Sequence, residues 1–275
     1  MVGKLTAAFE RAKREGRVAF IPYVMAGDPD LGATETILTA LGAAGADIIE
    51  VGVPHSDPLA DGPTIASAGA RALANGTRLD DVLALVRRIS ATCAPLLLFT
   101  YFNPVYQFGL ERFAGEAAGA GAAGAIVPDC ALEESAQLQR TLHAHGLEMP
   151  LLVAPSTTRD RARLIAGAAS GFVYVVSRLG VTGARTAPDF APLKAQLAML
   201  RVLTAKPLAV GFGLSRVAEV REVAAHADGV VVGSALIEAY ANAKAGEAAE
   251  RVTSFVTPLI AAARAPEPRA RSSAE

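Results

Sequence analysis

The sequence contains no tryptophan, and aromatic residues of all kinds occupy only 5% of its 275 positions. Its two cysteines, Cys93 and Cys130, are too few for a disulfide framework or a cysteine-based metal cluster, and they favour a reducing cytoplasm. Neither charge is in excess, because 26 Lys and Arg face 27 Asp and Glu, so we expect no nucleic-acid-binding or membrane-binding surface. No apolar run approaches the ~20 residues that span a bilayer, and residues 1–4 do not begin a signal peptide. These absences predict a cytoplasmic protein whose core is built from small aliphatic side chains.

Hydrophobic residues are plentiful, at 52% of the chain, and they gather in short β-branched runs. The runs are almost continuously apolar, which is typical of strands buried on both faces of a parallel sheet. They predict strands at 18–24, 47–51, 96–99, 125–127, 151–153, 172–176, 208–210 and 229–232. Segments with helical spacing separate them, at 31–44, 79–90, 110–119, 132–145, 159–168, 188–200 and 216–226.

Eight strand-helix units over about 250 residues predict a (β/α)8 TIM barrel. The alternative is a doubly wound open sheet, which usually begins with a GxGxxG turn after the first strand. Here that turn reads Met25-Ala-Gly-Asp-Pro, so we favour the barrel. We predict one domain over 1–264, with an extra N-terminal helix at 5–15 that could plug the barrel and a long insertion at 54–75 after the second strand. The segment 265–275 is rich in Pro, Arg and Ser and is expected to be disordered.

Two carboxylates follow the second predicted strand, at the end of the barrel where active sites lie. Glu50 stands within the apolar run 48–53, where the charged form of a carboxyl is disfavoured and its pKa rises toward the range of acid–base catalysis. The alternative is a structural carboxylate paired with a basic residue across the barrel. Asp61 lies on the Pro- and Gly-rich loop that follows, where it could equally be an ordinary turn residue, as could Asp57.

Glycines after the last three predicted strands indicate a site for an anion. Gly213 and the pair Gly233-Ser234 each precede a helix, where free backbone N–H groups bind phosphate in many barrels. A Gly- and Thr-rich segment that contains Gly183 follows the sixth strand and could close as a lid. No His, Cys or carboxylate cluster suits a metal, and no lysine at a strand's carboxyl end suits a Schiff base. The residues therefore predict acid–base chemistry without a cofactor, on a phosphorylated small molecule.

Several motifs together resemble the α chain of tryptophan synthase. They are Glu50-Val-Gly-Val-Pro-His-Ser-Asp-Pro-Leu-Ala-Asp-Gly-Pro-Thr-Ile, Tyr101-Phe-Asn-Pro, Pro128-Asp129, Tyr174-Val-Val-Ser-Arg-Leu-Gly-Val-Thr-Gly, Gly211-Phe-Gly-Leu-Ser and Val232-Gly-Ser-Ala. The resemblance covers about 5–262.

The resemblance implies a carbon–carbon lyase of L-tryptophan biosynthesis that cleaves indole-3-glycerol phosphate into indole and glyceraldehyde 3-phosphate. It implies that Glu50 transfers the protons, and that Asp61 accepts a hydrogen bond from the indole N–H and stabilises the positive charge that develops there. The residues that would line the indole and glycerol pocket are Tyr23, Phe99, Tyr101, Tyr174, Thr182 and Phe212. The phosphate would be held by Gly183, Gly213, Gly233 and Ser234.

The same resemblance implies a partner, a tryptophan synthase β chain that carries pyridoxal phosphate, in an α2β2 heterotetramer. This chain itself would need no cofactor. Two positions depart from the family pattern near the expected partner region, with His55 in place of Phe and Ala131 in place of Pro. Two alternatives stay open: a free-standing indole-3-glycerol phosphate lyase, and a barrel without catalytic activity that activates a partner.

Overall fold

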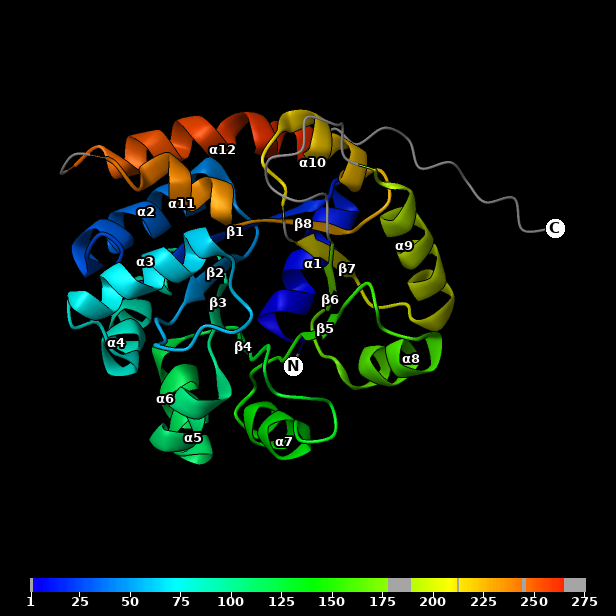
Figure 1. Ribbon diagram of the computed structural model, residues 1–275, viewed down its shortest axis with the longest axis horizontal. Coiled ribbons are helices and arrows are strands. Elements are labelled where there is room, and N and C mark those ends of the chain that lie inside the picture. Colours follow the sequence, from blue (N-terminus) through cyan, green and yellow to red (C-terminus); the bar gives the residue numbers. More distant parts are fainter. Residues whose placement is uncertain (1, 178–188, 212, 244–245, 265–275) are drawn as a thin grey trace.

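Eight parallel strands surround a central axis and helices pack around them, as Figure 1 shows. The computed structural model describes residues 2–177, 189–211, 213–243 and 246–264. Its strands are β1 (Ala19–Met25), β2 (Ile49–Gly52), β3 (Leu96–Phe99), β4 (Gly124–Ile126), β5 (Leu151–Val153), β6 (Val173–Val176), β7 (Leu208–Gly211) and β8 (Gly229–Val232). Each lies within two residues of a predicted strand at either end, so the predicted TIM barrel is confirmed.

The sheet runs in the order β4-β3-β2-β1-β8-β7-β6-β5, and only the seam between β4 and β5 lacks a full ladder. Two backbone hydrogen bonds span this seam just before β5. The N–H of Ala125 donates to the carbonyl of Glu148 at 3.0 Å, and the N–H of Glu148 donates to the carbonyl of Ala123 at 3.1 Å. The barrel is therefore nearly closed, and its strands are buried on both faces as their apolar runs predict.

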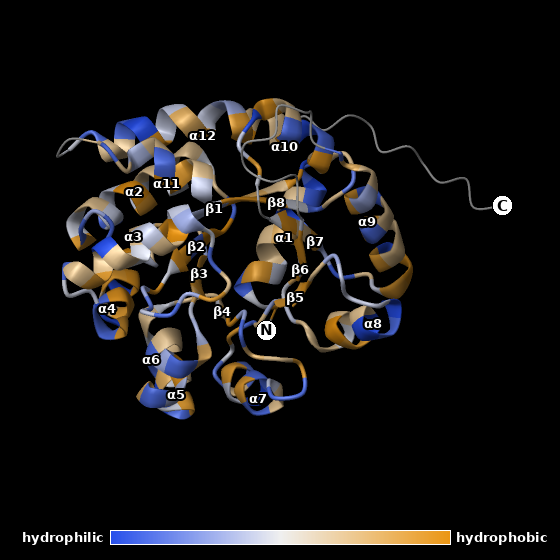
Figure 2. Cartoon of the chain, in the orientation of Figure 1, coloured by the Kyte–Doolittle hydropathy of each residue, from blue (hydrophilic) through white to orange (hydrophobic). Residues whose placement is uncertain are grey.

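The helices of the described residues follow the strands in chain order. They are α1 (Lys4–Arg14), α2 (Leu31–Ala44), α3 (Pro63–Ala74), α4 (Leu79–Ile89), α5 (Phe102–Phe108), α6 (Leu110–Ala120), α7 (Ala136–Ala144), α8 (Arg159–Ala168), α9 (Ala191–Leu203), α10 (Val217–Ala224), α11 (Ser234–Tyr240) and α12 (Ala248–Arg264). In Figure 2 the strands are mostly hydrophobic, whereas the helices carry both hydrophobic and hydrophilic residues. This difference is expected of helices that cover a barrel and face water on their outer side.

The helices differ from the sequence prediction in several places, and the long helix α12 has no counterpart among the predicted helices. The insertion 54–75 contains α3, which starts with Gly62 as its N-cap and Pro63 in the first turn, a position that proline tolerates. Helix α5 is short, and sequence periodicity over seven residues is too weak to predict it. Helix α7 begins later than predicted because the Ser135 side chain donates to the Leu132 carbonyl at 2.7 Å and forms a turn instead.

Helix α1 closes the end of the barrel at which the strands begin, as its position in the sequence suggests (Figure 1). Phe9 is 3% exposed and packs against Phe172, with ring centroids 5.2 Å apart. The first turn of the helix is held by Glu148, whose carboxylate accepts from the N–H groups of Leu5 at 2.6 Å and Thr6 at 3.2 Å. A carboxylate at a helix N-terminus satisfies free N–H groups and suits the helix dipole. Water is thus excluded from this end of the barrel.

In the described part of the chain, no helix combines the length and the apolar character that a membrane crossing requires. The predicted disordered segment 265–275 lies outside the described residues.

Candidate active site

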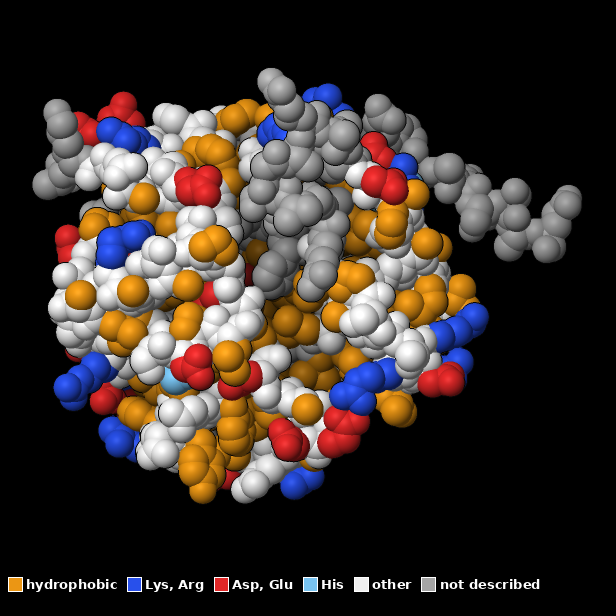
Figure 3. Space-filling model, in the orientation of Figure 1, with side chains coloured by type: hydrophobic (Ala, Val, Ile, Leu, Met, Phe, Trp, Pro, Cys, Tyr) orange, Lys and Arg blue, Asp and Glu red, His pale blue; other side chains and the backbone are white. Residues whose placement is uncertain are grey.

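A pocket opens at the other end of the barrel, where the strands finish. It spans about 410 Å³, part of which is open to solvent, and is lined by Tyr23, Glu50, Asp61, Ile65, Phe99, Tyr174, Gly213, Val231, Gly233 and Ser234. Figure 3 shows this face of the molecule, with hydrophobic side chains around a central hollow. The structure therefore brings both predicted catalytic carboxylates to one pocket, together with six other predicted site residues.

Glu50 lies deep in this pocket. It is the second residue of β2, it pairs in register with Tyr23 of β1, and its side chain is 1% exposed. Its Oε1 atom has no hydrogen-bond partner, and none of the basic side chains that the structure describes pairs with it. Burial raises the pKa of Glu50 from 4.5 to about 8, because the charged form loses its hydration. The alternative of a structural ion pair across the barrel has no support in the described residues.

Asp61 lies nearer the mouth of the pocket, on the loop between β2 and α3, and is half-buried. Its N–H donates to the Pro58 carbonyl at 3.1 Å, which forms a tight turn. Tyr101 holds the same loop, because its hydroxyl accepts from the Ala60 N–H at 3.0 Å and hydrogen-bonds to Asp61. Burial raises the pKa of Asp61 to about 6, while the bond from Tyr101 acts in the opposite direction. Asp57 is exposed and does not line the pocket.

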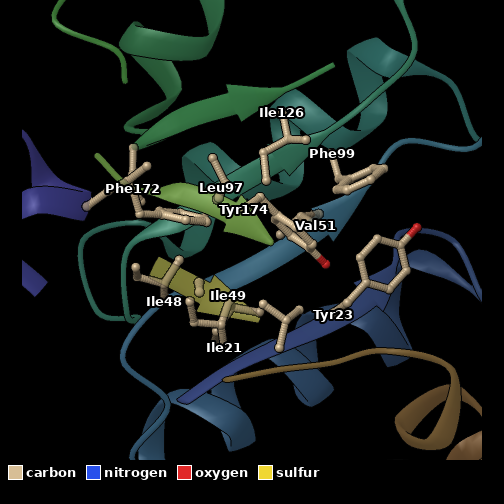
Figure 4. Packing of buried hydrophobic residues seen from close by; sticks show 14 of the residues in the cluster. Ile21, Tyr23, Ile48, Ile49, Val51, Leu97, Phe99, Ile126, Phe172 and Tyr174 are labelled. Carbon is tan, nitrogen blue, oxygen red and sulfur yellow. The ribbon is translucent and has the colours of Figure 1, made fainter. Parts of the chain in front are cut away.

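Aromatic rings form part of the wall of this pocket, and Figure 4 shows three of them, Tyr23, Phe99 and Tyr174, near one another. The rings of Tyr23 and Phe99 meet edge to face, with centroids 5.7 Å apart and an interplanar angle of 88°. Glycines on the neighbouring strands make room for the two tyrosines. A Cβ atom on Gly52 would lie 2.1 Å from the Tyr23 hydroxyl oxygen, and one on Gly211 would lie 2.2 Å from that of Tyr174.

Three residues of the predicted anion site also face the pocket: Gly213 after β7, and Gly233 and Ser234 at the start of α11. The loops after two neighbouring strands thus meet at one edge of the pocket. The predicted site residues Thr182, Gly183 and Phe212 lie outside the described residues.

Sequence reasoning did not identify Ile65, Val231, Gly52 or Gly211 as parts of the site. Val231 could have been found from the alternation of side chains along a strand. It precedes the predicted site residue Gly233 by two residues, so the two positions fall on the same side of the chain. Ile65 lies on α3, a helix within the segment that the sequence predicts only as an insertion. The roles of the glycines depend on contacts between strands, and no local pattern indicates them.

The site combines one carboxyl that is protonated at neutral pH, deep in an aromatic-walled pocket, with a second that is ionised and lies nearer the mouth of the pocket. Pairs of carboxyls whose environments separate their pKa values are typical of acid–base catalysis. No group of three or more His, Cys, Asp or Glu residues in the described ranges could hold a metal ion.

Comparison with known proteins agrees with this geometry. The family model described as tryptophan synthase alpha chain matches residues 9–264. The chain belongs to the tryptophan synthase α chain family. The resemblance in its motifs is thereby confirmed, and so is the predicted class of activity, a lyase of tryptophan biosynthesis.

Relatives and solved structures match almost the whole chain. The tryptophan synthase alpha chain of a Picosynechococcus species is 46% identical over 91% of this chain and 96% of its own. That of Geobacter sulfurreducens is 42% identical over 94% of this chain and 98% of its own. A tryptophan synthase structure from Mycobacterium tuberculosis aligns with a TM-score of 0.88 at 38% identity, over 96% of this chain and all of that chain. The tryptophan synthase subunit alpha of Legionella pneumophila aligns with a TM-score of 0.88 at 34% identity, over 95% of this chain and 98% of its own.

The burial of Glu50 makes the stability of the protein depend on pH. The pKa of this carboxyl is about 8 in the folded chain and about 4.5 when exposed, so between these values the folded state binds more protons. Stability therefore falls as pH rises, by on the order of 3 kcal/mol between pH 5 and pH 8. We expect Glu50→Gln to remove this part of the decline in the free energy of unfolding, measured by urea unfolding at each pH. Glu10→Gln, at an exposed position of α1, should leave the decline unchanged. If the free energy of unfolding falls with pH as steeply in Glu50→Gln as in the unaltered chain, the assignment is contradicted.

Proposed function

We propose that this chain cleaves indole-3-glycerol phosphate into indole and glyceraldehyde 3-phosphate by a retro-aldol reaction. The observation that carries the proposal is the buried Glu50 carboxyl without a partner, in an aromatic-walled pocket that it shares with Asp61. The chemistry of the substrate requires this combination. Indole C3 must gain a proton before the ring can accept electrons, and the adjacent glycerol hydroxyl must lose one as the aldehyde forms.

Glu50 can carry out both proton transfers in sequence. With its pKa raised to about 8, it is protonated at neutral pH and donates its proton to indole C3. The resulting carboxylate accepts the proton of the glycerol hydroxyl, the C–C bond breaks, and its electron pair returns to the ring. Indole and the aldehyde are released, and Glu50 ends in the protonated form in which it began.

Asp61 supplies the complementary charge. It is ionised above pH 6 and would accept a hydrogen bond from the indole N–H, where positive charge develops as C3 is protonated. Tyr23, Phe99, Tyr101 and Tyr174 would contact the flat ring and the glycerol. Their contribution is the shape of the pocket and the exclusion of water.

The phosphate would lie at the loops after β7 and β8. Gly213, Gly233 and Ser234 border the pocket there, and glycine lets an anion approach the backbone N–H groups closely. Gly183 and Thr182, on the segment after β6, and Phe212, after β7, stay predictions of the sequence.

Loss of the acid is the most direct test of the reaction. We expect Glu50→Gln to abolish release of indole from indole-3-glycerol phosphate, because an amide can neither donate nor accept the transferred proton. Binding of glyceraldehyde 3-phosphate should persist, since its phosphate contacts lie elsewhere in the pocket. The matched Glu10→Gln variant should keep full activity. Retained turnover in Glu50→Gln would refute the role of Glu50.

The two pKa values predict a bell-shaped profile of kcat/KM. The rate falls below about pH 6, where Asp61 becomes protonated, and above about pH 8, where Glu50 loses its proton. Asp61→Asn should lower kcat/KM by more than about tenfold, or ~1.4 kcal/mol of barrier, and should remove the acidic limb. A smaller loss with the acidic limb intact would reduce Asp61 to a positioning role.

We also infer that the chain works with a pyridoxal-phosphate-dependent β chain in a cytoplasmic α2β2 heterotetramer. Two large exposed apolar residues, on segments that follow the carboxyl ends of β2 and β3, support a docking surface at this end of the barrel: Leu59, 79% exposed on the loop that carries Asp61, and Tyr106, 62% exposed on α5. The His55 ring lies 5.0 Å from that of Tyr101, and Ala131 follows Asp129, whose side chain accepts from the Phe102 N–H of α5 at 2.9 Å. The free thiols of Cys93 and Cys130 suit a reducing compartment.

Addition of the β chain separates the three possible roles of this chain. We expect the isolated chain to release indole slowly and the β chain to accelerate it several-fold, because docking at Leu59 would order the Asp61 loop. An isolated chain that is fully active and unaffected by the β chain would select a free-standing lyase. Activation of the β chain without any cleavage of indole-3-glycerol phosphate would select a non-catalytic barrel.

A further inference from the structure

Helix α3 links the Asp61 loop to the rest of the barrel, yet little apolar surface holds it in place. It begins two residues after Asp61, and Ile65 in its first turn lines the pocket. Its buried residues are only Ala68, Gly69 and Ala72. Small side chains bury little apolar area, so packing alone fixes such a helix weakly.

Polar side chains supply the attachment instead. Arg71 forms a two-bonded ion pair with Asp28, from Nε to Oδ1 and from Nη2 to Oδ2, both at 2.8 Å. Asp28 follows β1 and is 1% exposed, so this charge depends on its partner. One turn further, the Asn75 side chain donates to the carbonyls of Gly27 and Pro29 on the same loop. The second half of α3 is thus fastened to the end of β1.

The first half of α3 is fastened to another helix of the site. The Thr64 hydroxyl donates to Glu238 of α11 at 3.0 Å. Helix α11 begins at Ser234, which lines the pocket. Thr64, Ala68, Arg71 and Asn75 are spaced by four, three and four residues, so they share one face of the helix. Ile65 lies on the adjacent face and points to the pocket, with its Cδ1 atom near Gly233.

We propose that Arg71 is a positioning residue for the cleavage reaction, which holds α3 through Asp28 so that Asp61 faces the substrate. The inference rests on the proposed function. Arg71 lies eight residues from Pro63, about 12 Å along the helix, and the rigid helix passes any displacement on to the Asp61 loop. A misplacement of about 1 Å at a reacting group can cost about a hundredfold in rate.

The test compares the steady-state kinetics of Arg71→Gln in the unaltered chain and in the Asp61→Asn background, with single-turnover rates at excess enzyme for variants too slow for steady state. We expect Arg71→Gln to lower kcat by at least about tenfold and to change KM by less than about threefold, because the phosphate loops are not disturbed. In the Asp61→Asn background its effect should shrink to below about twofold, since the group that Arg71 positions is already lost. Equal effects in both backgrounds would overturn the proposal.

A matched control separates positioning from general loosening of the fold. Arg17 pairs at 2.6 Å with Asp47, which is 2% exposed, and this pair lies at the opposite end of the barrel. Arg17→Gln should therefore lower the midpoint of thermal unfolding but leave kcat within about twofold. If it lowers kcat as much as Arg71→Gln does, the proposal is wrong.

A conservative variant covers the case in which Arg71→Gln does not fold. Arg71→Lys keeps the charge but cannot form two parallel bonds to Asp28, so its kcat should lie between those of the unaltered chain and Arg71→Gln. Its effect should likewise shrink in the Asp61→Asn background, and an equal effect in both backgrounds would overturn the proposal in the same way.

The outcome also separates this inference from the proposed function. An unaltered chain that does not cleave indole-3-glycerol phosphate would refute the proposed function itself, whereas a fully active Asp61→Asn variant would refute the role of Asp61 on which this inference depends. An active chain with an impaired Asp61→Asn variant and an unimpaired Arg71→Gln variant would refute only the role of Arg71.

Discussion

Burial of an unpaired carboxyl is the constraint on which the site depends. Glu50 lies on the inner face of β2, in register with Tyr23 on one side and Leu97 on the other, and its surroundings offer no compensating charge among the described residues. Such a group stays inside a folded protein by remaining neutral. A proton donor must also be neutral at physiological pH, so the same burial that is unfavourable for the charged carboxyl makes Glu50 able to donate a proton. Helix α1 preserves this state because it excludes water from the far end of the barrel.

The two carboxyls are eleven residues apart in sequence, and their pKa values differ because Glu50 lies deeper in the pocket than Asp61. Glu50 belongs to a strand, while Asp61 lies on a loop near the mouth, half-buried and hydrogen-bonded by Tyr101. The strand position is fixed by the whole sheet, whereas the loop position depends on its anchors. Tyr101 holds the loop directly, and the pair formed by Arg71 and Asp28 holds the helix that follows it. A proton-transferring group in a rigid place and a charge-stabilising carboxylate on an adjustable loop suit a site that must admit a substrate.

The barrel could be predicted from sequence because its strands are continuous apolar runs, and the composition of each run indicates its burial without knowledge of the other segments. Glu50 was predictable for the same reason, since a carboxyl stands out within such a run. Helix α3 was not, because its buried face is built from alanine and glycine and its attachment comes from Arg71 and Asp28, which are 43 residues apart. The space that Gly52 and Gly211 leave for tyrosine hydroxyls likewise follows from packing between strands. Features that depend on a residue and its neighbours in one strand or helix could be predicted from the sequence. Features that depend on contacts between two distant residues could not.

The central claim is that the Glu50 carboxyl carries its proton at neutral pH. Infrared difference spectra between the unaltered chain and Glu50→Gln, recorded across a pH titration, test it directly through the carbonyl stretch of a protonated carboxyl. We expect this band to be present at pH 7 and to disappear with a midpoint near 8. A band that disappears near 4.5, the ordinary value for a glutamic acid, would contradict the claim.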